Sequence, residues 1–245
     1  MRHSLVSLFA WALSDIGRKR SHNEDSYFFS TEEGIFVIAD GMGGHKGGEF
    51  ASKLAVDSSV EKFLACKNNH ESPEQALEHA FNHAACTVYD AQRKNHLLSG
   101  MGTTLSALAI LHNKAFIAHI GDTRIYCIRD KNIHQLTSDH SLVNEQVQAG
   151  IMSAEEARTS SLRNIITRAI GHNKEIIADY FSLTCRKNDL FLLCSDGLNN
   201  MLQDQEILFI INNNTPEQAA LELINAANKN GGEDNISVIL ISIKK

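Results

Sequence analysis

One phrase occurs twice in this sequence: an apolar run that ends in an aspartate followed by glycine. Residues 35–44 read IFVIADGMGG, and residues 190–197 read LFLLCSDG. A short, uninterrupted apolar run is typical of a buried β-strand, and glycine adopts turn geometries that are closed to other residues. Each phrase therefore predicts a strand that holds one carboxylate, Asp40 or Asp196, at its end. Such a placement suits a hard divalent cation.

Further carboxylates share this context. Asp122 lies in a Gly-Asp turn between strand-like runs, Asp234 directly precedes the last apolar run, and Glu24 and Asp25 end a charged loop. Asp beside Gly is also ordinary turn chemistry, so each residue alone is as consistent with a turn as with a site. Converging carboxylates repel one another unless cations neutralise them. An all-oxygen set without Cys or paired His favours Mg²⁺ or Mn²⁺ over Zn²⁺.

The rest of the chain alternates strand-like runs with longer amphipathic segments. Apolar spacings of three and four predict a helix from Glu49 whose apolar face includes Phe50 and Phe63, and capping boxes predict helices after Ser72 and Thr215. Short connections in the middle of the chain favour antiparallel pairing. Strands are expected at 6–13, 26–30, 35–39, 104–111, 115–120, 124–128 and 236–243, and further helices at 138–150, 153–158 and 204–211.

We expect a single domain spanning residues 1–245, because no Pro/Gly/Ser-rich linker or low-complexity tract interrupts the chain. The apolar content of 43% suffices for a large core. Strands grouped around short turns, with long helices inserted, predict an α+β domain with mostly antiparallel sheet. A mainly polar stretch at residues 159–164 is expected to be a mobile loop.

Composition argues against several other classes of protein. The net charge of -6, with scattered Lys and Arg, provides no basic stripe for a nucleic-acid backbone. No segment approaches the roughly 20 apolar residues that span a membrane. The five cysteines are odd in number and lack a CxxC spacing, and several of them lie inside apolar runs, as reduced core thiols do. We therefore expect a cytoplasmic protein that binds neither nucleic acid nor membrane.

Two other motifs favour structural interpretations. His79 and His83 lie four apart on a predicted helix, the spacing of two metal ligands, but Ala80 stands where the HExxH pattern has Glu. A partly exposed helix face is therefore favoured over a catalytic zinc site. The glycines of residues 41–48 match neither GxxxxGK[ST] nor GxGxxG, so a nucleotide loop is not favoured.

Several segments together carry a family resemblance. They are RSHNED (20–25), ADGMGGHKGGEFAS (39–52), GMGTT (100–104), HIGDTRIY (119–126), ITRAIG (166–171), CSDGL (194–198) and GGEDNISV (231–238). In this order and approximate spacing, the chain resembles bacterial-type members of the protein phosphatase 2C family, the metal-dependent Ser/Thr phosphatases. The resemblance implies two mostly antiparallel β-sheets sandwiched between helical layers, in agreement with the α+β pattern.

The resemblance also implies a metal centre. By it, Asp40 bridges two ions, Mn²⁺ or Mg²⁺, and Gly41 contributes its backbone carbonyl. Glu24 serves one ion directly or through water. Asp196 and Asp234 hold the other ion.

Further roles follow from the same resemblance. Asp122 matches a position that, with Asp196, holds a third metal in bacterial members. Arg20 matches the guanidinium that grips the substrate phosphate, a bidentate task for which Lys is a poor substitute. Asn235 is expected to orient Asp234 or a bound water, and Asp25 is expected to support the metal ligands without binding an ion. A flap is expected beside the active site at about residues 150–165, with a backbone carbonyl that reaches the third metal.

The implied reaction is hydrolysis of phosphoserine or phosphothreonine in one in-line step, by a hydroxide that bridges the two ions and without a phosphoenzyme intermediate. The ions and Arg20 stabilise charge on the equatorial oxygens. The histidine proposed as general acid in many eukaryotic members has no clear equivalent here. His45, near Asp40 in the sequence, is one candidate acid, and water on a metal is another.

The implied substrates are phosphorylated Ser/Thr proteins, and the implied partner is a cognate Ser/Thr kinase together with its targets. We expect a monomer. Two alternatives stay open at this point: a catalytically inactive relative that acts as a binding module, and a two-metal hydrolase of small phosphate esters. Loss of ligand carboxylates would mark the first, whereas the second has much the same reaction centre.

Overall fold

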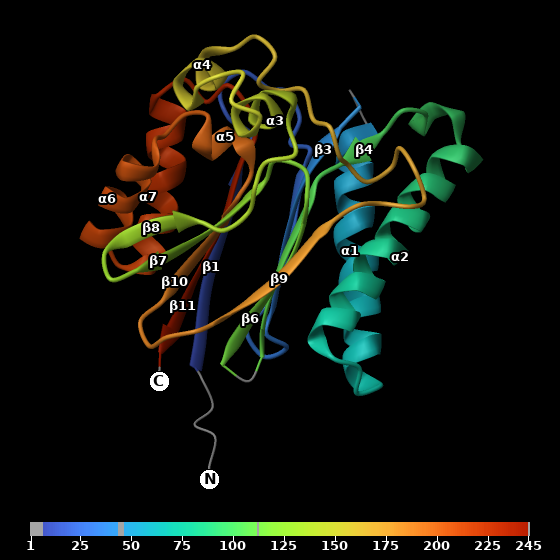
Figure 1. The fold of residues 1–245 in the computed structure, drawn as a ribbon, viewed down its shortest axis with the longest axis horizontal. Helices are drawn as coiled ribbons and strands as arrows, with labels where there is room; N and C mark the ends of the chain where they lie inside the picture. Colours follow the sequence, from blue (N-terminus) through green and yellow to red (C-terminus); the bar gives the residue numbers. More distant parts are fainter. Residues whose placement is uncertain (1–6, 44–46, 112, 245) are drawn as a thin grey trace.

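A computed structural model describes residues 7–43, 47–111 and 113–244. The described residues form two β-sheets between two helical layers (Figure 1). The strands are β1 (Ser7–Asp15), β2 (Asp25–Ser30), β3 (Ile35–Met42), β4 (Gly102–Thr103), β5 (Leu105–Leu111), β6 (Lys114–Ile120), β7 (Arg124–Arg129), β8 (Asn132–Gln135), β9 (Asp179–Thr184), β10 (Leu190–Cys194) and β11 (Ile236–Lys244). The helices are α1 (Gly47–Asn68), α2 (Pro73–Lys94), α3 (Leu142–Gln148), α4 (Ala154–Thr159), α5 (Asp196–Asn199), α6 (Asp204–Asn213) and α7 (Pro216–Lys229), with a short 3-10 helix at His96–Leu98.

Both sheets are antiparallel, which confirms the expectation from the short connections. One sheet has the strand order β1-β11-β10-β7-β8, and the other has the order β2-β3-β5-β6-β9 with β4 paired to β3. The first and last described strands pair along their whole lengths, from Ser7 opposite Lys244 to Asp15 opposite Ile236. The loop that follows β1 is thereby brought beside the loop that precedes β11.

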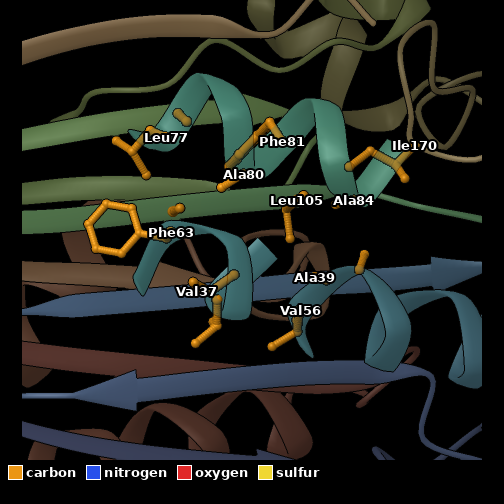
Figure 2. Packing of buried hydrophobic residues seen from close by; sticks show 14 of the residues in the cluster. Val37, Ala39, Val56, Phe63, Leu77, Ala80, Phe81, Ala84, Leu105 and Ile170 are labelled. Atoms are coloured by element: carbon orange, nitrogen blue, oxygen red, sulfur yellow. The ribbon is translucent and has the colours of Figure 1, made fainter. Parts of the chain in front are cut away.

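The uninterrupted apolar runs arise because each sheet is covered on both faces. Successive side chains of a strand point to opposite faces. On β3, Val37 and Ala39 pack against α1 and α2 (Figure 2), whereas Phe36 and Ile38 pack against the other sheet. The sheet that contains β1, β11, β10, β7 and β8 is covered on its outer face by α6 and α7. These four layers confirm the predicted fold of two sheets between helical layers.

The cap predictions for the helices are confirmed, and one face prediction is wrong. The Ser72 hydroxyl accepts a hydrogen bond from the Gln75 backbone N–H at the start of α2, and Thr215 caps α7 in the same way. Phe63 on α1 is buried as expected, but Phe50 is 44% exposed. The first turns of α1 instead present small residues such as Ala51 to the sheet, so the helix approaches the strands too closely for a phenylalanine ring there.

Several element boundaries differ from the predictions. β3 continues beyond Ala39 to Met42, because Gly41 and Met42 pair with the two residues of β4. The helix expected at 138–150 is shorter, since Ser141 caps it and α3 begins at Leu142. Strands β8 and β9 were not predicted, and both are edge strands with largely exposed side chains. Within the described residues, no helix is both long and apolar enough to cross a membrane.

Candidate active site

The alternation of side chains along the strands brings carboxylates to one edge of the interface between the two sheets. Asp40 follows Phe36 and Ile38 on the face of β3 that looks toward the other sheet. On the neighbouring strand, Asp25 opens β2 directly opposite Asp40. Asp196 begins α5 two residues after β10, so it reaches the same edge from the other sheet. The two copies of the strand-Asp-Gly phrase therefore meet across the two sheets.

The loop that carries Arg20 and Glu24 is held by one amide. The Nδ2 of Asn235 donates to the backbone carbonyls of Ile16 and His22, each at 2.9 Å, and its Oδ1 accepts from the backbone N–H of Glu24 at 2.7 Å. These bonds tie the loop after β1 to the start of β11. Asn235 thus positions Glu24 through the backbone, which the sequence did not reveal.

Arg20 lies beside Asp234 at the rim of this edge. The Arg20 Nη2 donates to the Asp234 Oδ2 at 2.6 Å, and the Asn235 backbone N–H donates to the Asp234 Oδ1 at 2.8 Å. The Arg20 side chain is 50% exposed. A phosphate arriving from solvent can therefore reach the guanidinium and share it with Asp234.

Two glycines permit backbone approaches that a side chain would block. A Cβ on Gly41 would lie 2.1 Å from the carbonyl oxygen of Gly48, and one on Gly197 would lie 2.1 Å from that of Asn235. The first contact seats the start of α1 against β3 beside Glu24, and the second seats α5 against β11. Glycine at these positions thus brings the carboxylate-bearing segments together.

Burial and mutual repulsion raise the pKa values of the carboxyls at this edge. Burial raises the pKa of Asp40 well above its ordinary value, and the charges of Asp25, Asp196 and Asp122 raise it further. Burial likewise raises the pKa of Asp25 to about 7, that of Asp196 to about 6, and that of Asp122 well above its ordinary value. Burial also raises the pKa of Glu24, and the charge of Arg20 partly offsets this rise. Crowded anions of this kind call for cations.

The donor atoms fit hard metal ions. Among the described residues, Asp25 Oδ1, Asp122 Oδ1 and Asp196 Oδ1 are buried oxygens without a hydrogen-bond partner. Buried acceptors nearly always have a hydrogen-bond partner, so unpaired carboxylate oxygens at one edge indicate a binding site for cations. All of the converging donors are oxygens, the ligands that Mg²⁺ and Mn²⁺ prefer. The expected metal residues are therefore gathered at one place: Glu24, Asp40, Gly41, Asp122, Asp196 and Asp234.

Asp122 approaches from the turn after β6, and a buried histidine helps to hold that turn. The Gly121 backbone N–H donates to His140 Nδ1 at 3.1 Å, and the rings of His140 and His119 lie with centroids 4.8 Å apart. Burial lowers the pKa of His119 to about 4, so its ring is neutral at physiological pH. Asp122 then borders a recess of about 300 Å³ that Asp196 also lines.

Residues 150–165, where a flap is expected, contribute Ala154, Ala157, Arg158 and Arg163 to the lining of this recess. They contain α4 and a turn at residues 161–164, and the Arg163 Nη2 donates to the Glu233 Oε2 at 3.0 Å. Glu233 immediately precedes Asp234, so this pair joins the two segments. The candidate acid His45 lies outside the described residues.

Three residues that support the site were missed in the sequence. The Ser195 hydroxyl donates to Asp25 Oδ2 at 2.7 Å, and the Thr104 hydroxyl accepts from the Asp40 backbone N–H at 2.8 Å. Asp139 forms a bidentate pair with Arg124, at 2.9 and 2.6 Å, and lines the recess. Thr104 and Ser195 lie in motif segments, whereas no spacing in the sequence indicates that Asp139 is close to Asp122.

Known proteins share both the sequence and this arrangement. The sequence profile of the family described as protein phosphatase 2C matches residues 17–236. Protein phosphatase PhpP of Streptococcus pneumoniae is 40% identical over 243 residues, which cover 95% of this chain and 96% of PhpP. The serine/threonine phosphatase stp of Listeria monocytogenes is 36% identical over 234 residues, covering 93% of each chain.

Solved structures are similar over nearly the full length. The serine/threonine phosphatase PstP/Ppp of Mycobacterium tuberculosis superposes with a TM-score of 0.92 at 33% identity, over 98% of this chain and 100% of that one. The catalytic domain of PstP in complex with two manganese ions gives a TM-score of 0.87 at 33% identity, with the same coverage.

The four-layer fold and the match to these phosphatases place the chain in the class of metal-dependent phosphatases. More narrowly, the chain belongs to the protein phosphatase 2C family, and it is a serine/threonine protein phosphatase.

Proposed function

We propose that this phosphatase holds two divalent ions, Mn²⁺ or Mg²⁺, at the edge between its sheets. Asp40 bridges them, the Gly41 carbonyl and Glu24 complete one side, and Asp196 and Asp234 complete the other. The observation that carries this proposal is the crowding of buried carboxyls at one sheet edge, among them Asp196, whose Oδ1 has no hydrogen-bond partner. The raised pKa values of Asp40 and Asp196, caused first by burial and then by neighbouring carboxylates, also favour bound cations. The two manganese ions of the PstP complex support the number of ions.

We further propose a third metal position shared by Asp122 and Asp196, whose unpaired oxygens both lie at the recess under the flap. The flap, at about residues 150–165, belongs to a single phosphatase domain of residues 1–245. The Arg163–Glu233 pair supports a flap that closes against the ligand segment.

The bound ions supply a water of lowered pKa and neutralise the phosphate. Arg20 binds and orients two phosphate oxygens from the rim. Asp25 accepts from Ser195 and Asn235 tethers the Glu24 loop, so both residues position ligands without touching the substrate. His45 remains our candidate for protonating the leaving alkoxide, with water as the alternative.

We propose phosphoserine and phosphothreonine in proteins as the substrates, with a cognate Ser/Thr kinase and its targets as partners in bacterial, cytoplasmic signalling. The half-exposed Arg20 supports large substrates, because a phosphate on a protein surface reaches it without entering a deep pocket. We propose that the chain acts as a monomer. All expected ligand carboxylates are present and converge, which argues against an inactive binding module.

The deciding experiment is hydrolysis of a phosphothreonine peptide and of a small phosphate ester, with Mn²⁺, with chelator, and with Asp40→Asn. We expect turnover of the peptide with Mn²⁺, none with chelator, recovery after Mn²⁺ is added back, and none in the variant. Metal-independent turnover, or full activity of Asp40→Asn, would sink the bridging assignment. A strong preference for the small ester would favour the alternative hydrolase.

A further inference from the structure

A second group of metal-ligating side chains lies where α1 turns into α2. Cys66 is in the last turn of α1, Glu71 is in the connection, and His79 is in the second turn of α2. α1 has 22 residues, and a rise of about 1.5 Å per residue gives it a length of roughly 33 Å. Its first turn abuts Glu24 and Gly41, so this group lies far from the carboxylate edge, at the opposite end of the two helices (Figure 1).

The helix end itself brings the donors together. His70 adopts a left-handed conformation with φ of 62°, the Glu71 backbone N–H donates to the Cys66 carbonyl at 3.2 Å, and the His70 N–H donates to that of Lys67 at 3.1 Å. This is the hydrogen-bond pattern of a Schellman motif, which folds the chain back over the last turn. Ser72 then caps α2, and the helix returns along α1 with His79 facing Cys66.

The three donor atoms nearly form one face of a metal polyhedron. Cys66 Sγ lies 3.7 Å from His79 Nδ1, which lies 2.7 Å from Glu71 Oε2, and all three donors lie within 4.8 Å of one another. Ligands of tetrahedral Zn²⁺ stand about 3.3–3.6 Å apart, given metal–ligand bonds of about 2.0–2.3 Å. A cation in place of the shared proton would widen the His79–Glu71 contact, while the Cys66 and Glu71 donor atoms, which lie no more than 4.8 Å apart, would complete the set.

We infer that Cys66, Glu71 and His79 form a metal site for a Zn²⁺-class cation, separate from the catalytic centre. A thiolate, an imidazole and a carboxylate are the donors that zinc accepts, with water in the fourth position. On binding, the thiol proton passes to solvent, and the proton shared by His79 Nδ1 and Glu71 leaves Nδ1, so that the imidazole carries its one proton on Nε2. Cys66 is buried, while the side chains of His79 and Glu71 are 51% and 29% exposed, so an ion enters from solvent and meets the thiol beneath.

The surroundings favour a cation over a bare hydrogen-bonded cluster. The C-terminal end of a long helix carries partial negative charge, so the last turn of α1 attracts a positive ion. An ion here would join α1 to α2, the two helices that cover one face of a sheet (Figure 2). His83, which shares the i, i+4 spacing with His79, is not part of the group. This inference does not depend on the proposed catalytic ligands.

The test is a titration of the full chain with Co²⁺ in saturating Mg²⁺, which occupies oxygen sites. We expect about one equivalent of Co²⁺ to give a thiolate-to-cobalt charge-transfer band and the visible bands of tetrahedral cobalt, both abolished by Zn²⁺. Oxygen ligands alone cannot give the charge-transfer band. We expect Cys66→Ser to remove the band and His79→Gln to weaken Co²⁺ binding at least tenfold.

Matched controls are His83→Gln, one helical turn further on, and Cys86→Ser, a thiol elsewhere on α2; both should keep the band and the affinity. Absence of the band in the wild-type chain, or its persistence in both ligand variants, would show that the three side chains only hydrogen-bond to one another. Loss of the band in Cys86→Ser would equally overturn the inference. If Cys66→Ser fails to fold, as circular dichroism would reveal, the partly exposed His79→Gln decides the matter alone.

Discussion

The two ends of helix α1 lie beside two proposed metal sites that have different kinds of donor atom. Its first turn packs on Gly41 and Glu24, where carboxylates from both sheets converge, whereas its last turn carries Cys66 beside Glu71 and His79. The first group draws on residues more than 200 positions apart and contains only oxygen; the second spans a single helical hairpin and mixes sulfur, nitrogen and oxygen. Hard ions suit the first set, and Zn²⁺-class ions suit the second.

The largest expected effect is a loss of catalysis at the carboxylate end of α1 that leaves the Cys66 end unchanged. Asp196→Asn removes charge from the proposed ligand of the second and third ion positions, so kcat should fall on the order of 10³-fold, about 4 kcal/mol of transition-state stabilisation. Peptide hydrolysis with Mn²⁺ measures this fall, and Asp57→Asn, the same change on the exposed surface of α1, is the control. The cobalt–thiolate band should be the same in both variants. Loss of the band in Asp196→Asn would show that cobalt binding at Cys66 depends on the carboxylate site.

Asn235→Ala tests whether the carboxylate end depends on its tether. The change removes three hydrogen bonds that hold the Arg20–Glu24 loop. We expect a loss of about 2–3 kcal/mol in the free energy of unfolding and a fall in kcat/KM of more than tenfold. Denaturant titration and steady-state kinetics measure both. Asn213→Ala, which breaks one exposed bond, should change neither; wild-type kinetics in Asn235→Ala would refute the tether.

Arg20→Ala tests phosphate binding at the rim. Because the proposed contact of Arg20 with the phosphate is present in the ground state as well as in the transition state, we expect mainly a rise in KM, about tenfold or 1.4 kcal/mol. Its exposed neighbour Lys19 provides the control substitution Lys19→Ala. An unchanged KM in Arg20→Ala would assign the phosphate to another cation.

When chelator removes metal ions, the free energy of unfolding should depend on pH because Asp25 ionises. The pKa of Asp25 is about 7 in the folded chain against an ordinary 3.8, so the folded chain binds this proton more tightly. Stability contributed by Asp25 is therefore lost as the pH rises from about 4 to about 7. Relative to wild type, Asp25→Asn should melt at a higher temperature at pH 8, and the difference should vanish near pH 4. A gap that does not vary with pH would contradict the raised pKa.

The last prediction concerns the other end of α1, at Cys66, Glu71 and His79. Zn²⁺ at 100 times its dissociation constant contributes about 2.7 kcal/mol, which raises the melting temperature by roughly 5–10 °C in a chain of this size. The rise should be absent in His79→Gln and present in His83→Gln, both measured in excess Mg²⁺. Equal rises in the two variants would place the zinc elsewhere.

Local patterns in the sequence predicted those features that depend on neighbouring residues. The caps at Ser72 and Thr215, the buried runs before Asp40 and Asp196, and the antiparallel pairing follow from periodicity and turn chemistry, and the structure confirms them. Edge strands β8 and β9 escaped prediction because their exposed side chains carry no strong alternation. Phe50 was misplaced because amphipathic spacing does not tell how closely a helix approaches its sheet.

The sequence by itself determined the chemistry of the carboxylate end: which oxygens exist, and that a strand and a glycine turn aim several of them. Tertiary structure alone decided that β1 lies against β11, so that Asn235 holds the loop of Arg20 and Glu24, and that Asp139 lines the recess beside Asp122. Tertiary structure likewise decided that His79 lies with Cys66 and Glu71, and that His83 is not part of this group. The physical reason is that hydrogen bonding and burial between distant segments depend on packing, which no spacing along the chain encodes.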